Sequence, residues 1–394
     1  MATGKYEYVN IGNYLFLTFL RIWAGVTAIF FFRRYKVVKE APVPRDHPVI
    51  FAVNHQSAFL DPVLIGISCG RKPWYLTRAG VFQGKFVKFL LRAIHMLPVY
   101  RQRDNVNVKH ANEDTFDECV KILGGMGSVL IFPEGNHGML KYLRTPLKKG
   151  LARIVFEAES THDFQLGVQI IPVGINYEHP TKFRTDVLIN CGKPYSIKSF
   201  KSIFQQSRSE AFNQFNRDLE ERMSELMLNI TPVERYDQTE KEWMLHRRKE
   251  NSLLQRFNSD KKIIAAISAG DSLSDEGQAK TGWIKWIMRI LGLPIFIAGF
   301  VLNLPVFIIT RLILKKSVRD PHFLQSVKFV CAMAGVPLFS ALEAGIIYSF
   351  FGTFWIPFFA IPLLGIIAYD YWDLLIRGNS YVPTRSLGAV YLPE

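Results

Sequence analysis

The chain has 394 residues, a formal net charge of +14 at pH 7, and a hydrophobic content of 49%. That length suits one catalytic domain with an appended element. A strongly basic balance is typical of proteins that bind nucleic acid, an anionic membrane surface or an anionic substrate. Because no nucleic-acid-binding motif is recognisable and long apolar runs are present, the composition favours a membrane over nucleic acid.

The cysteines are few, distant from one another and not arranged in CxxC pairs. They are Cys69, Cys119, Cys191 and Cys331. This spacing predicts neither a disulfide framework nor a zinc site, so we expect reduced thiols. The sequence as a whole implies no bound metal and no tightly held cofactor. The N-terminus lacks the basic region and small-residue cleavage pattern of a signal peptide, and no removable leader is expected.

The first apolar run covers residues 11–32 and contains a single charge, Arg21, before the basic cluster Arg33, Arg34 and Lys36. A charge near the middle of a membrane span is costly. The pattern therefore favours an embedded or interfacial anchor over a simple span, with a buried helix of a soluble domain as the alternative. We assign residues 1–40 to this N-terminal membrane anchor.

Residues 41–230 alternate between strand-like and helix-like patterns. A strand is predicted at 49–53, and Asp61-Pro62 predicts a helix start, with Asp61 as the N-cap, that runs to about Cys69. Further elements are predicted as helix 106–123, strand 128–132, helix 147–158, strand 168–177 and helix 209–229. This alternation indicates an α/β domain with a covered sheet.

The remainder divides into a charged linker and an apolar region. Residues 231–281 form the linker, in which 232–262 reads as a surface helix. Residues 282–394 form a C-terminal membrane domain, with a long first segment, 283–314, interrupted by Pro294 and Pro305. Two further spans are predicted at 327–351 and 354–371.

Basic residues flank these apolar segments and predict their orientation. They are Lys280, Lys285, Lys315, Lys316, Arg319, Arg377 and Arg385. If the segment 283–314 is a re-entrant hairpin, every basic flank falls on one side, and the last two segments cross out and back. The α/β domain would then face the cytoplasm. A single long tilted span for 283–314 is the competing arrangement.

Four stretches of the α/β domain carry residue types suited to chemistry. They are Asn54-His55-Gln56-Ser57-Ala58-Phe59-Leu60-Asp61-Pro62, Leu97-Pro98-Val99-Tyr100-Arg101, Phe132-Pro133-Glu134-Gly135-Asn136-His137 and Ile171-Pro172-Val173-Gly174-Ile175-Asn176-Tyr177. Each has a structural explanation on its own, such as a strand-end histidine, a helix cap or a turn. Their occurrence together and in this order favours a functional site.

The first stretch has a specific chemical interpretation. A histidine just past a strand end is accessible to substrate, and its neutral imidazole accepts a proton from an alcohol near pH 7. A carboxylate beside it fixes the tautomer and stabilises the imidazolium. His55 and Asp61 are six residues apart, which on a continuous helix is an offset of about 600°. The chain must therefore turn between them if they are to meet.

The ordered set of four stretches resembles the glycerolipid acyltransferase family, which includes lysophosphatidic acid and glycerol-3-phosphate acyltransferases. The resemblance covers about residues 45–200 and implies an α/β fold with a covered mixed sheet. It implies that His55 is the general base and that Asp61 orients it. Arg101 would bind the acceptor phosphate, Glu134 and Gly135 would bind or position the acceptor, and Pro172 would shape the acyl or acceptor site.

Two departures from the family pattern bear on the acceptor. Five residues separate His55 from Asp61, where the family usually has four. Asn136-His137 stands where Thr or Ser followed by Arg is usual, so an arginine that might hold phosphate is missing. Other basic side chains are candidates to replace it, although a solvated basic face is an alternative reading. They are Lys141, Arg144, Lys148 and Lys149.

The resemblance implies a membrane-bound O-acyltransferase that moves a fatty acyl group from acyl-CoA or acyl-carrier protein to glycerol-3-phosphate or 1-acylglycerol-3-phosphate, as a step of phospholipid biosynthesis. A different lysolipid or an acylated amino acid is an alternative acceptor. A non-catalytic lipid-binding membrane protein is a further alternative. The expected partners are membrane lipids and the acyl carrier, with no nucleic acid; the sequence leaves the oligomeric state open.

Overall fold

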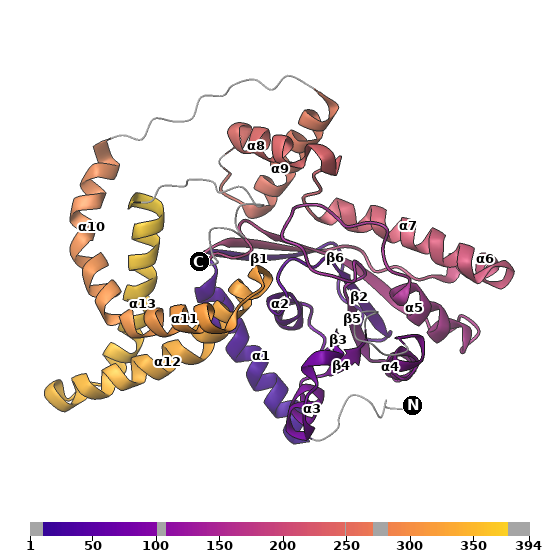
Figure 1. The fold of residues 1–394 in the computed structure, drawn as a ribbon, viewed down its shortest axis with the longest axis horizontal. Coiled ribbons are helices and arrows are strands. Elements are labelled where there is room, and N and C mark those ends of the chain that lie inside the picture. The colour runs from indigo at the N-terminus through magenta and orange to yellow at the C-terminus, as the bar shows by residue number, and fades with distance from the viewer. Residues whose placement is uncertain (1–10, 101–107, 249, 271–282, 377–394) are drawn as a thin grey trace.

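A computed structural model describes residues 11–100, 108–248, 250–270 and 283–376, and a seven-stranded sheet lies at the centre of its α/β domain (Figure 1). The strands are β1 (Arg34–Lys39), β2 (Val49–Val53), β3 (Trp74–Arg78), β4 (Met96–Val99), β5 (Ser128–Ile131), β6 (Gln169–Tyr177) and β7 (Asp186–Cys191). Their order is β1-β7-β6-β2-β5-β3-β4, and every neighbouring pair is parallel except β6 and β7. The predicted mixed sheet is therefore confirmed, and β2 to β6 all end at one edge.

Helices cover both faces of the sheet. One face is covered by α1 (Ile11–Phe31) and α2 (Leu60–Ser68), and the other by α4 (Val108–Gly124), α5 (Gly150–Ser160) and α7 (Arg208–Leu226). The shorter helices are α3 (Lys85–Ala93) and α6 (Lys201–Gln206). Side chains of β2 alternate between two cores, with Ile50 and Ala52 in one and Val49, Phe51 and Val53 in the other. A strand buried on both faces reads as a continuous apolar run, as β2 does.

The sheet begins earlier than the sequence pattern suggested. β1 pairs with β7 from Arg34 to Lys39, which lies inside the segment assigned to the membrane anchor. The helix α1 therefore leads directly into the sheet after Phe31. Residues 34–39 include both charged and apolar types and none is fully buried, as expected for an edge strand.

Asp61 is not the N-cap of α2, contrary to the sequence prediction. The helix begins one residue earlier, at Leu60, and its N-cap is Phe59, which offers no side-chain acceptor. The Asp61 carboxylate instead accepts backbone N–H groups from Gln56 and Ser57, both at 2.8 Å. The chain thus folds back over Asp61, and this turn brings His55 to the same carboxylate.

The charged linker forms two helices rather than one surface helix. They are α8 (Tyr236–His246) and α9 (Leu253–Ala269), and they share a small core that includes the fully buried Trp243 and Tyr236. Arg247 joins this hairpin to the sheet by ion pairs with Glu178, at the end of β6, and with Asp260 of α9. The interleaved aromatic residues of the linker therefore form a core of their own instead of lying on a solvated helix.

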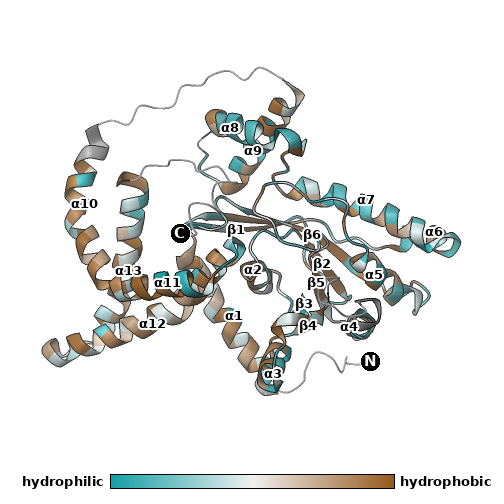
Figure 2. Ribbon diagram, viewed as in Figure 1, coloured by the Kyte–Doolittle hydropathy of each residue, from teal (hydrophilic) through white to brown (hydrophobic). Residues whose placement is uncertain are grey.

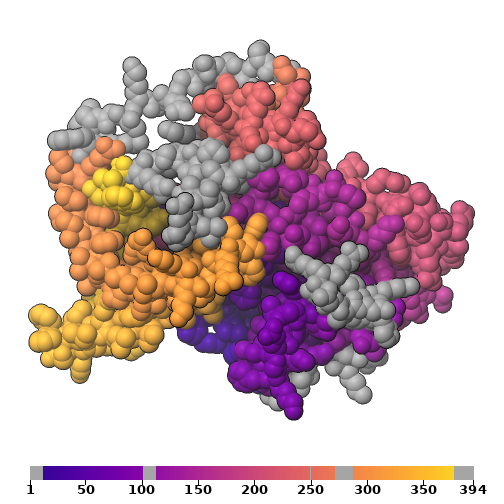
Figure 3. Space-filling view, in the orientation of Figure 1, coloured from indigo at the N-terminus to yellow at the C-terminus, as the bar shows by residue number. Residues whose placement is uncertain are grey.

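The C-terminal region is an assembly of apolar helices on one side of the molecule (Figures 2 and 3). They are α10 (Trp283–Leu302), α11 (Leu304–Ser317), α12 (Leu324–Phe351) and α13 (Trp355–Tyr371). By length and composition, three helical stretches of the described chain suit a membrane span: Gly12–Phe31, Pro321–Phe351 and Trp355–Ile376. The pair α10 and α11 is bent by 59° at Asn303, as a broken span or a re-entrant loop would be. The chain is thus a membrane protein.

Ion pairs join α13 and α1 to the α/β domain. Asp370, near the end of α13, pairs with Arg33 at 3.3 Å and with Arg184 at 2.5 Å. Asp373 pairs with Arg33 at 2.7 Å and with Lys182 at 2.5 Å. Since Arg33 follows α1 and the other two cations lie between β6 and β7, this network fixes three separate segments to one another.

Candidate active site

Three of the four chemically interesting stretches meet at the edge of the sheet where the parallel strands end. His55 follows β2, Glu134 follows β5, and Tyr177 is the last residue of β6. These strands are neighbours in the order β6-β2-β5. The carboxyl ends of neighbouring parallel strands form the usual ligand-binding edge of an open α/β sheet.

His55 and Asp61 form a direct pair. The His55 Nδ1 atom lies 2.8 Å from Asp61 Oδ2, and the imidazole stacks on Phe132 with ring centroids 3.8 Å apart. The Asp61 side chain is fully buried, whereas 11% of the His55 side chain is exposed. With Nδ1 bound to the carboxylate, Nε2 is the nitrogen that remains for a substrate hydroxyl, which is the arrangement a general base requires.

The Asp61 carboxylate accepts a fourth hydrogen bond, from a residue to which the sequence analysis gave no role. The Tyr177 hydroxyl donates to Asp61 Oδ1 at 2.7 Å. Burial and the Asp61 charge raise the pKa of Tyr177 well above its ordinary value, so the hydroxyl keeps its proton and acts as a donor. Four donors thus stabilise the buried charge and fix the orientation of Asp61.

Tyr177→Phe is expected to lower kcat by about 10-fold, with a small effect on KM, because a hydrogen bond to a buried charge contributes about 1.5 kcal/mol or more. Steady-state kinetics of the full chain in detergent or nanodiscs measure this. Tyr142→Phe, on a partly buried tyrosine packed against Tyr236, is the matched control. Equal kcat values in Tyr177→Phe and the unmodified chain would contradict a positioning role.

Asn54 explains why the chain leaves the sheet just before His55. Its side-chain Oδ1 accepts the Ile175 N–H at 2.6 Å, and its Nδ2 donates to the Ile175 carbonyl at 3.1 Å. The Asn54 side-chain amide thus takes the place of a β2 backbone group. It satisfies the N–H and the carbonyl of Ile175 on β6 at the point where β2 ends. The asparagine that precedes the histidine therefore positions the turn that carries it.

Glu134 holds the other side of the His55 loop. Its Oε1 accepts the His55 backbone N–H at 2.8 Å, and its Oε2 lies 3.0 Å from Arg144 Nε. Burial raises the pKa of Glu134, against the effect of the Arg144 charge and the backbone donors. Gly135 follows with φ of +72°, a conformation that favours glycine and turns the chain away from β5. Both carboxylate oxygens of Glu134 are thus bound by groups of the protein: the His55 backbone N–H and Arg144.

Residues in the first turn of α12 and just before it pack directly on this loop. Ser326 Oγ accepts the backbone N–H groups of Phe59 and Leu60, both at 3.0 Å, and lies 3.3 Å from Ser57 Oγ. These are N–H groups of the first turn of α2, which lacks a cap of its own. Ala58 also donates its N–H to the His322 carbonyl at 3.2 Å. The C-terminal region of apolar helices, through Ser326 of α12, therefore supplies the cap of α2, the helix that carries Asp61.

Ser326→Ala is expected to lower the Tm of the full chain by a few degrees and to lower kcat several-fold, because loss of a helix cap costs about 1 kcal/mol. Differential scanning fluorimetry and steady-state kinetics test the two effects together. Ser349→Ala, near the far end of the same helix, is the control, since its hydroxyl bonds only to the nearby Ile346 carbonyl among the described residues. A Ser326 variant that matches this control would exclude a role for the cap.

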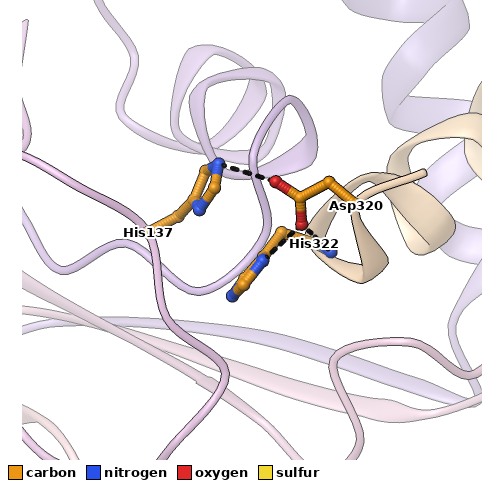
Figure 4. Close-up of side chains that lie close together, drawn as sticks. All are labelled: His137, Asp320 and His322. Carbon is orange, nitrogen blue, oxygen red and sulfur yellow. Dashed lines mark hydrogen bonds and ion pairs between the residues drawn. The ribbon is translucent and has the colours of Figure 1, made fainter. Parts of the chain in front are cut away.

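His137, Asp320 and His322 form a group of two histidines and one aspartate (Figure 4). His322 Nδ1 lies 2.6 Å from Asp320 Oδ1, His137 Nε2 lies 3.8 Å from Asp320 Oδ2, and the His137 and His55 ring centroids are 5.5 Å apart. One ligand atom from each of the three lies within 4.8 Å of the others, and such a donor set suits zinc. However, Asp320 Oδ1 also accepts the His322 backbone N–H at 3.0 Å, so this carboxylate is already engaged as a cap.

His137 itself is neutral near pH 7. Burial, followed by the nearby His322 and His55 side chains, lowers the pKa of His137 to about 4. Its ring stacks on that of His322 with centroids 4.3 Å apart. In the family pattern an arginine is usual at this part of the third stretch, and here an uncharged aromatic ring contacts the membrane region instead.

The other predicted site residues are placed differently. Arg101 lies outside the described residues. Pro172 is buried in the middle of β6, where its carbonyl accepts the Gly192 N–H at 2.9 Å, and no described contact joins it to His55 or Asp61. Its predicted effect on an acyl or acceptor site remains a prediction.

The four candidate cations for the missing arginine differ in availability. Lys141 is buried, and its Nζ donates to the backbone carbonyls of Tyr177 at 2.6 Å and Glu178 at 3.1 Å. Arg144 is engaged with Glu134 and with the His55 carbonyl. Lys148 and Lys149 are exposed, and the stem of Lys148 packs against the Gly135 turn.

The chain is similar in sequence to known acyltransferases. A family model described as Acyltransferase matches residues 34–176. A Schizosaccharomyces pombe protein named as an uncharacterized acyltransferase is 24% identical over 253 residues, which is 43% of this chain and 37% of that protein. A solved structure of the 1-acyl-sn-glycerophosphate (LPA) acyltransferase from Thermotoga maritima matches with a TM-score of 0.39 and 18% identity, over 54% of this chain and 80% of that chain.

Two Saccharomyces cerevisiae proteins are also similar. Glycerol-3-phosphate O-acyltransferase 1 is 40% identical over 68 residues, which is 17% of this chain and 9% of that protein. Glycerol-3-phosphate O-acyltransferase 2 is 32% identical over 99 residues, which is 24% of this chain and 13% of that protein. Each match thus spans at most 37% of the length of the curated relative.

The segment that matches the Acyltransferase family model, residues 34–176, contains His55, Asp61 and Glu134. This segment is similar to known acyltransferases, and its motifs resemble those of the glycerolipid acyltransferase family.

Proposed function

We propose that this protein is a membrane-bound O-acyltransferase that transfers a fatty acyl group from acyl-CoA or acyl-carrier protein to a hydroxyl of glycerol-3-phosphate, in phospholipid biosynthesis. The observation that carries the proposal is the 2.8 Å contact between His55 Nδ1 and the buried Asp61 carboxylate. This contact leaves His55 Nε2 available to the acceptor hydroxyl. The imidazole also stacks on the Phe132 ring, which holds it in position.

In the proposed mechanism, His55 Nε2 removes the proton of the acceptor hydroxyl as the oxygen attacks the thioester carbonyl. The tetrahedral intermediate collapses, the carbon–sulfur bond breaks, and the imidazolium returns the proton to the thiolate leaving group. Asp61 stabilises the imidazolium while it exists. The products are an ester and a free thiol, without a covalent enzyme intermediate and without any metal or tightly bound cofactor.

The names of the yeast relatives support glycerol-3-phosphate ahead of 1-acylglycerol-3-phosphate as the acceptor. For this acceptor the site needs a cation that reaches a phosphate near the Glu134-Gly135 turn. Lys148 meets that requirement among the described residues, because its stem packs on Gly135 while its side chain is exposed. Arg101, the phosphate ligand implied by the family resemblance, is the second candidate.

Lys148→Ala is expected to raise KM for glycerol-3-phosphate by about 5- to 10-fold with a smaller change in kcat, because an exposed ammonium–phosphate contact contributes about 1 kcal/mol. The matched control is Lys149→Ala, which removes the same charge one residue away. Equal KM changes in the two variants would assign the effect to the general basic surface instead of a phosphate contact.

Product analysis by mass spectrometry tests the proposed reaction. The purified full chain is incubated with acyl-CoA or acyl-carrier protein and, in separate reactions, with glycerol-3-phosphate, 1-acylglycerol-3-phosphate, glycerol, another lysophospholipid and an N-acyl amino acid. We expect 1-acylglycerol-3-phosphate as the main product. Faster acylation of an acceptor without phosphate would favour the alternative acceptors, and acceptor-independent release of fatty acid or no acyl transfer at all would contradict the proposal.

The proposal places the acyltransferase domain on the cytoplasmic side of the membrane, as for a bacterial inner-membrane or endoplasmic reticulum enzyme. The support is the basic residues next to the apolar segments, including Arg33 and Arg34 after α1 and Lys315 and Lys316 at the end of α11. The ends of α1 and α11 that carry these basic residues would then share one side. Protease protection of sealed vesicles would report the side on which the domain lies.

A further inference from the structure

α1 carries an arginine, Arg21, in the middle of an otherwise apolar helix, and the helix has two different sides. One side lies against the α/β domain, where Ala24 and Ala28 are buried and Lys72 Nζ donates to Thr18 Oγ1 at 3.0 Å. The other side exposes large apolar residues. They are Leu15, Phe19, Ile22, Val26 and Ile29. A helix built in this way suits the plane of the membrane interface.

Arg21 faces a basic cavity between α1 and the domain. The cavity has a volume of about 680 Å³ and lies among α1, the end of α2 and the beginnings of β3 and β5. Four cationic side chains line it: Arg21, Arg45, Arg71 and Lys72. The described residues that line it include no carboxylate. His95 also lines it, but burial lowers the pKa of His95 to about 4, so its ring is uncharged near pH 7.

The positive charges are held in place. Arg71 donates from Nη1 to the backbone carbonyls of Pro44 at 2.9 Å and Arg45 at 3.1 Å, and from Nη2 to that of Met126 at 2.6 Å. These bonds fix both the Arg71 guanidinium and the segment that carries Arg45. Cationic side chains gathered around one cavity attract an anion.

We propose that this cavity binds the phosphate headgroup of an anionic phospholipid. A lipid fits better than a free phosphate compound because Ile22, which is 65% exposed, lines the cavity and continues into the apolar outer side of α1. The phosphate would lie on the arginines while the acyl chains follow the helix. An arginine in an apolar helix then has a function, as a contact to the membrane surface.

This site is separate from the acyl-transfer site. The cavity lies at the edge where β3 and β5 begin, whereas His55 follows the end of β2, and the five residues of β2 span about 16 Å. The bound lipid would therefore be neither acceptor nor acyl donor. It would hold α1 and the domain at an anionic membrane surface.

Binding of short-chain lipids to the full chain in detergent tests the proposal without relying on activity. The titrants are dioctanoyl phosphatidylglycerol, dioctanoyl phosphatidylcholine and inorganic phosphate, and the readout is the dissociation constant from microscale thermophoresis or native mass spectrometry. We expect phosphatidylglycerol to bind at least 10-fold more tightly than phosphatidylcholine. We also expect Arg21→Gln combined with Arg45→Gln to weaken phosphatidylglycerol binding by 10-fold or more.

The charge-matched control is Arg217→Gln combined with Arg235→Gln, on exposed arginines outside the cavity, and it should bind phosphatidylglycerol as the unmodified chain does. Arg45→Gln alone, at an exposed position, keeps the test valid if the double variant fails to fold. Equal binding by the cavity variants and the control would overturn the proposal. Inorganic phosphate binding as tightly as phosphatidylglycerol would also overturn it, in favour of a soluble anion.

Discussion

His55→Ala is expected to lower kcat by about 10³-fold or more while the protein remains folded, because no other described side chain can take the proton of the acceptor hydroxyl at that position. Glu134 is buried and bound to backbone N–H groups and Arg144. His137 stacks on His322 and is held against the membrane region. Steady-state kinetics with glycerol-3-phosphate and acyl-CoA provide the measurement.

The matched control is His162→Ala, at the end of α5, which should retain full activity. The Tm of both variants, together with retained binding of acyl-CoA, would show that His55→Ala is folded. Residual activity within 10-fold of the unmodified chain would reject His55 as the general base. Since His55 contributes a stacked ring beside Phe132 and not a large part of a core, we expect only a small change in Tm.

The strands that carry the site could be predicted from the sequence. The runs 49–53, 128–132 and 168–177 were recognisable as buried strands, and the structure confirms β2, β5 and β6 there. Chemically suited residues just after such strands meet at one edge whatever the details of the loops. His55 and Asp61 were proposed from the chemistry of a histidine beside a carboxylate, and Glu134 from the family resemblance. The shared edge explains why the loops that carry them meet.

Side chains that act across strands could not be predicted, because their contacts depend on register. Asn54 bonds to Ile175 and Tyr177 bonds to Asp61 only because β2 and β6 pair with Val53 opposite Val173. The sequence signals were present but weak: an asparagine before the histidine, and a tyrosine that ends an apolar strand. Nothing within either strand determines the register alone.

The contacts of Ser326 were even less predictable from the sequence. It lies 266 residues from Leu60 along the chain and belongs to a segment whose composition indicated only a membrane helix. A contact of that separation follows from tertiary packing, not from a local pattern. The same reason explains the linker, where charge density predicted a surface helix but Trp243 and Tyr236 formed a core between α8 and α9.

Asp61→Asn is expected to lower kcat by about 10²- to 10³-fold, and the hydrogen bonds determine how. Asp61 Oδ2 faces three donors, His55 Nδ1, Gln56 N–H and Ser57 N–H, whereas Oδ1 faces only the Tyr177 hydroxyl. A hydroxyl can rotate to accept, but backbone N–H groups cannot. The asparagine amide should therefore point its oxygen at the three donors and its nitrogen at Tyr177. This preserves the His55 tautomer and removes only the charge that stabilises the imidazolium.

The double variant Asp61→Asn with Tyr177→Phe separates this explanation from a merely structural role. With phenylalanine at 177, the asparagine N–H₂ loses its acceptor, and turning the amide over would place it against the backbone donors. We therefore expect the double variant to lose more activity than the product of the two single effects, with kcat and not KM carrying the loss. Additive effects would mean that Asp61 and Tyr177 act independently, and an unchanged kcat in Asp61→Asn would show that the carboxylate charge has no part in the reaction.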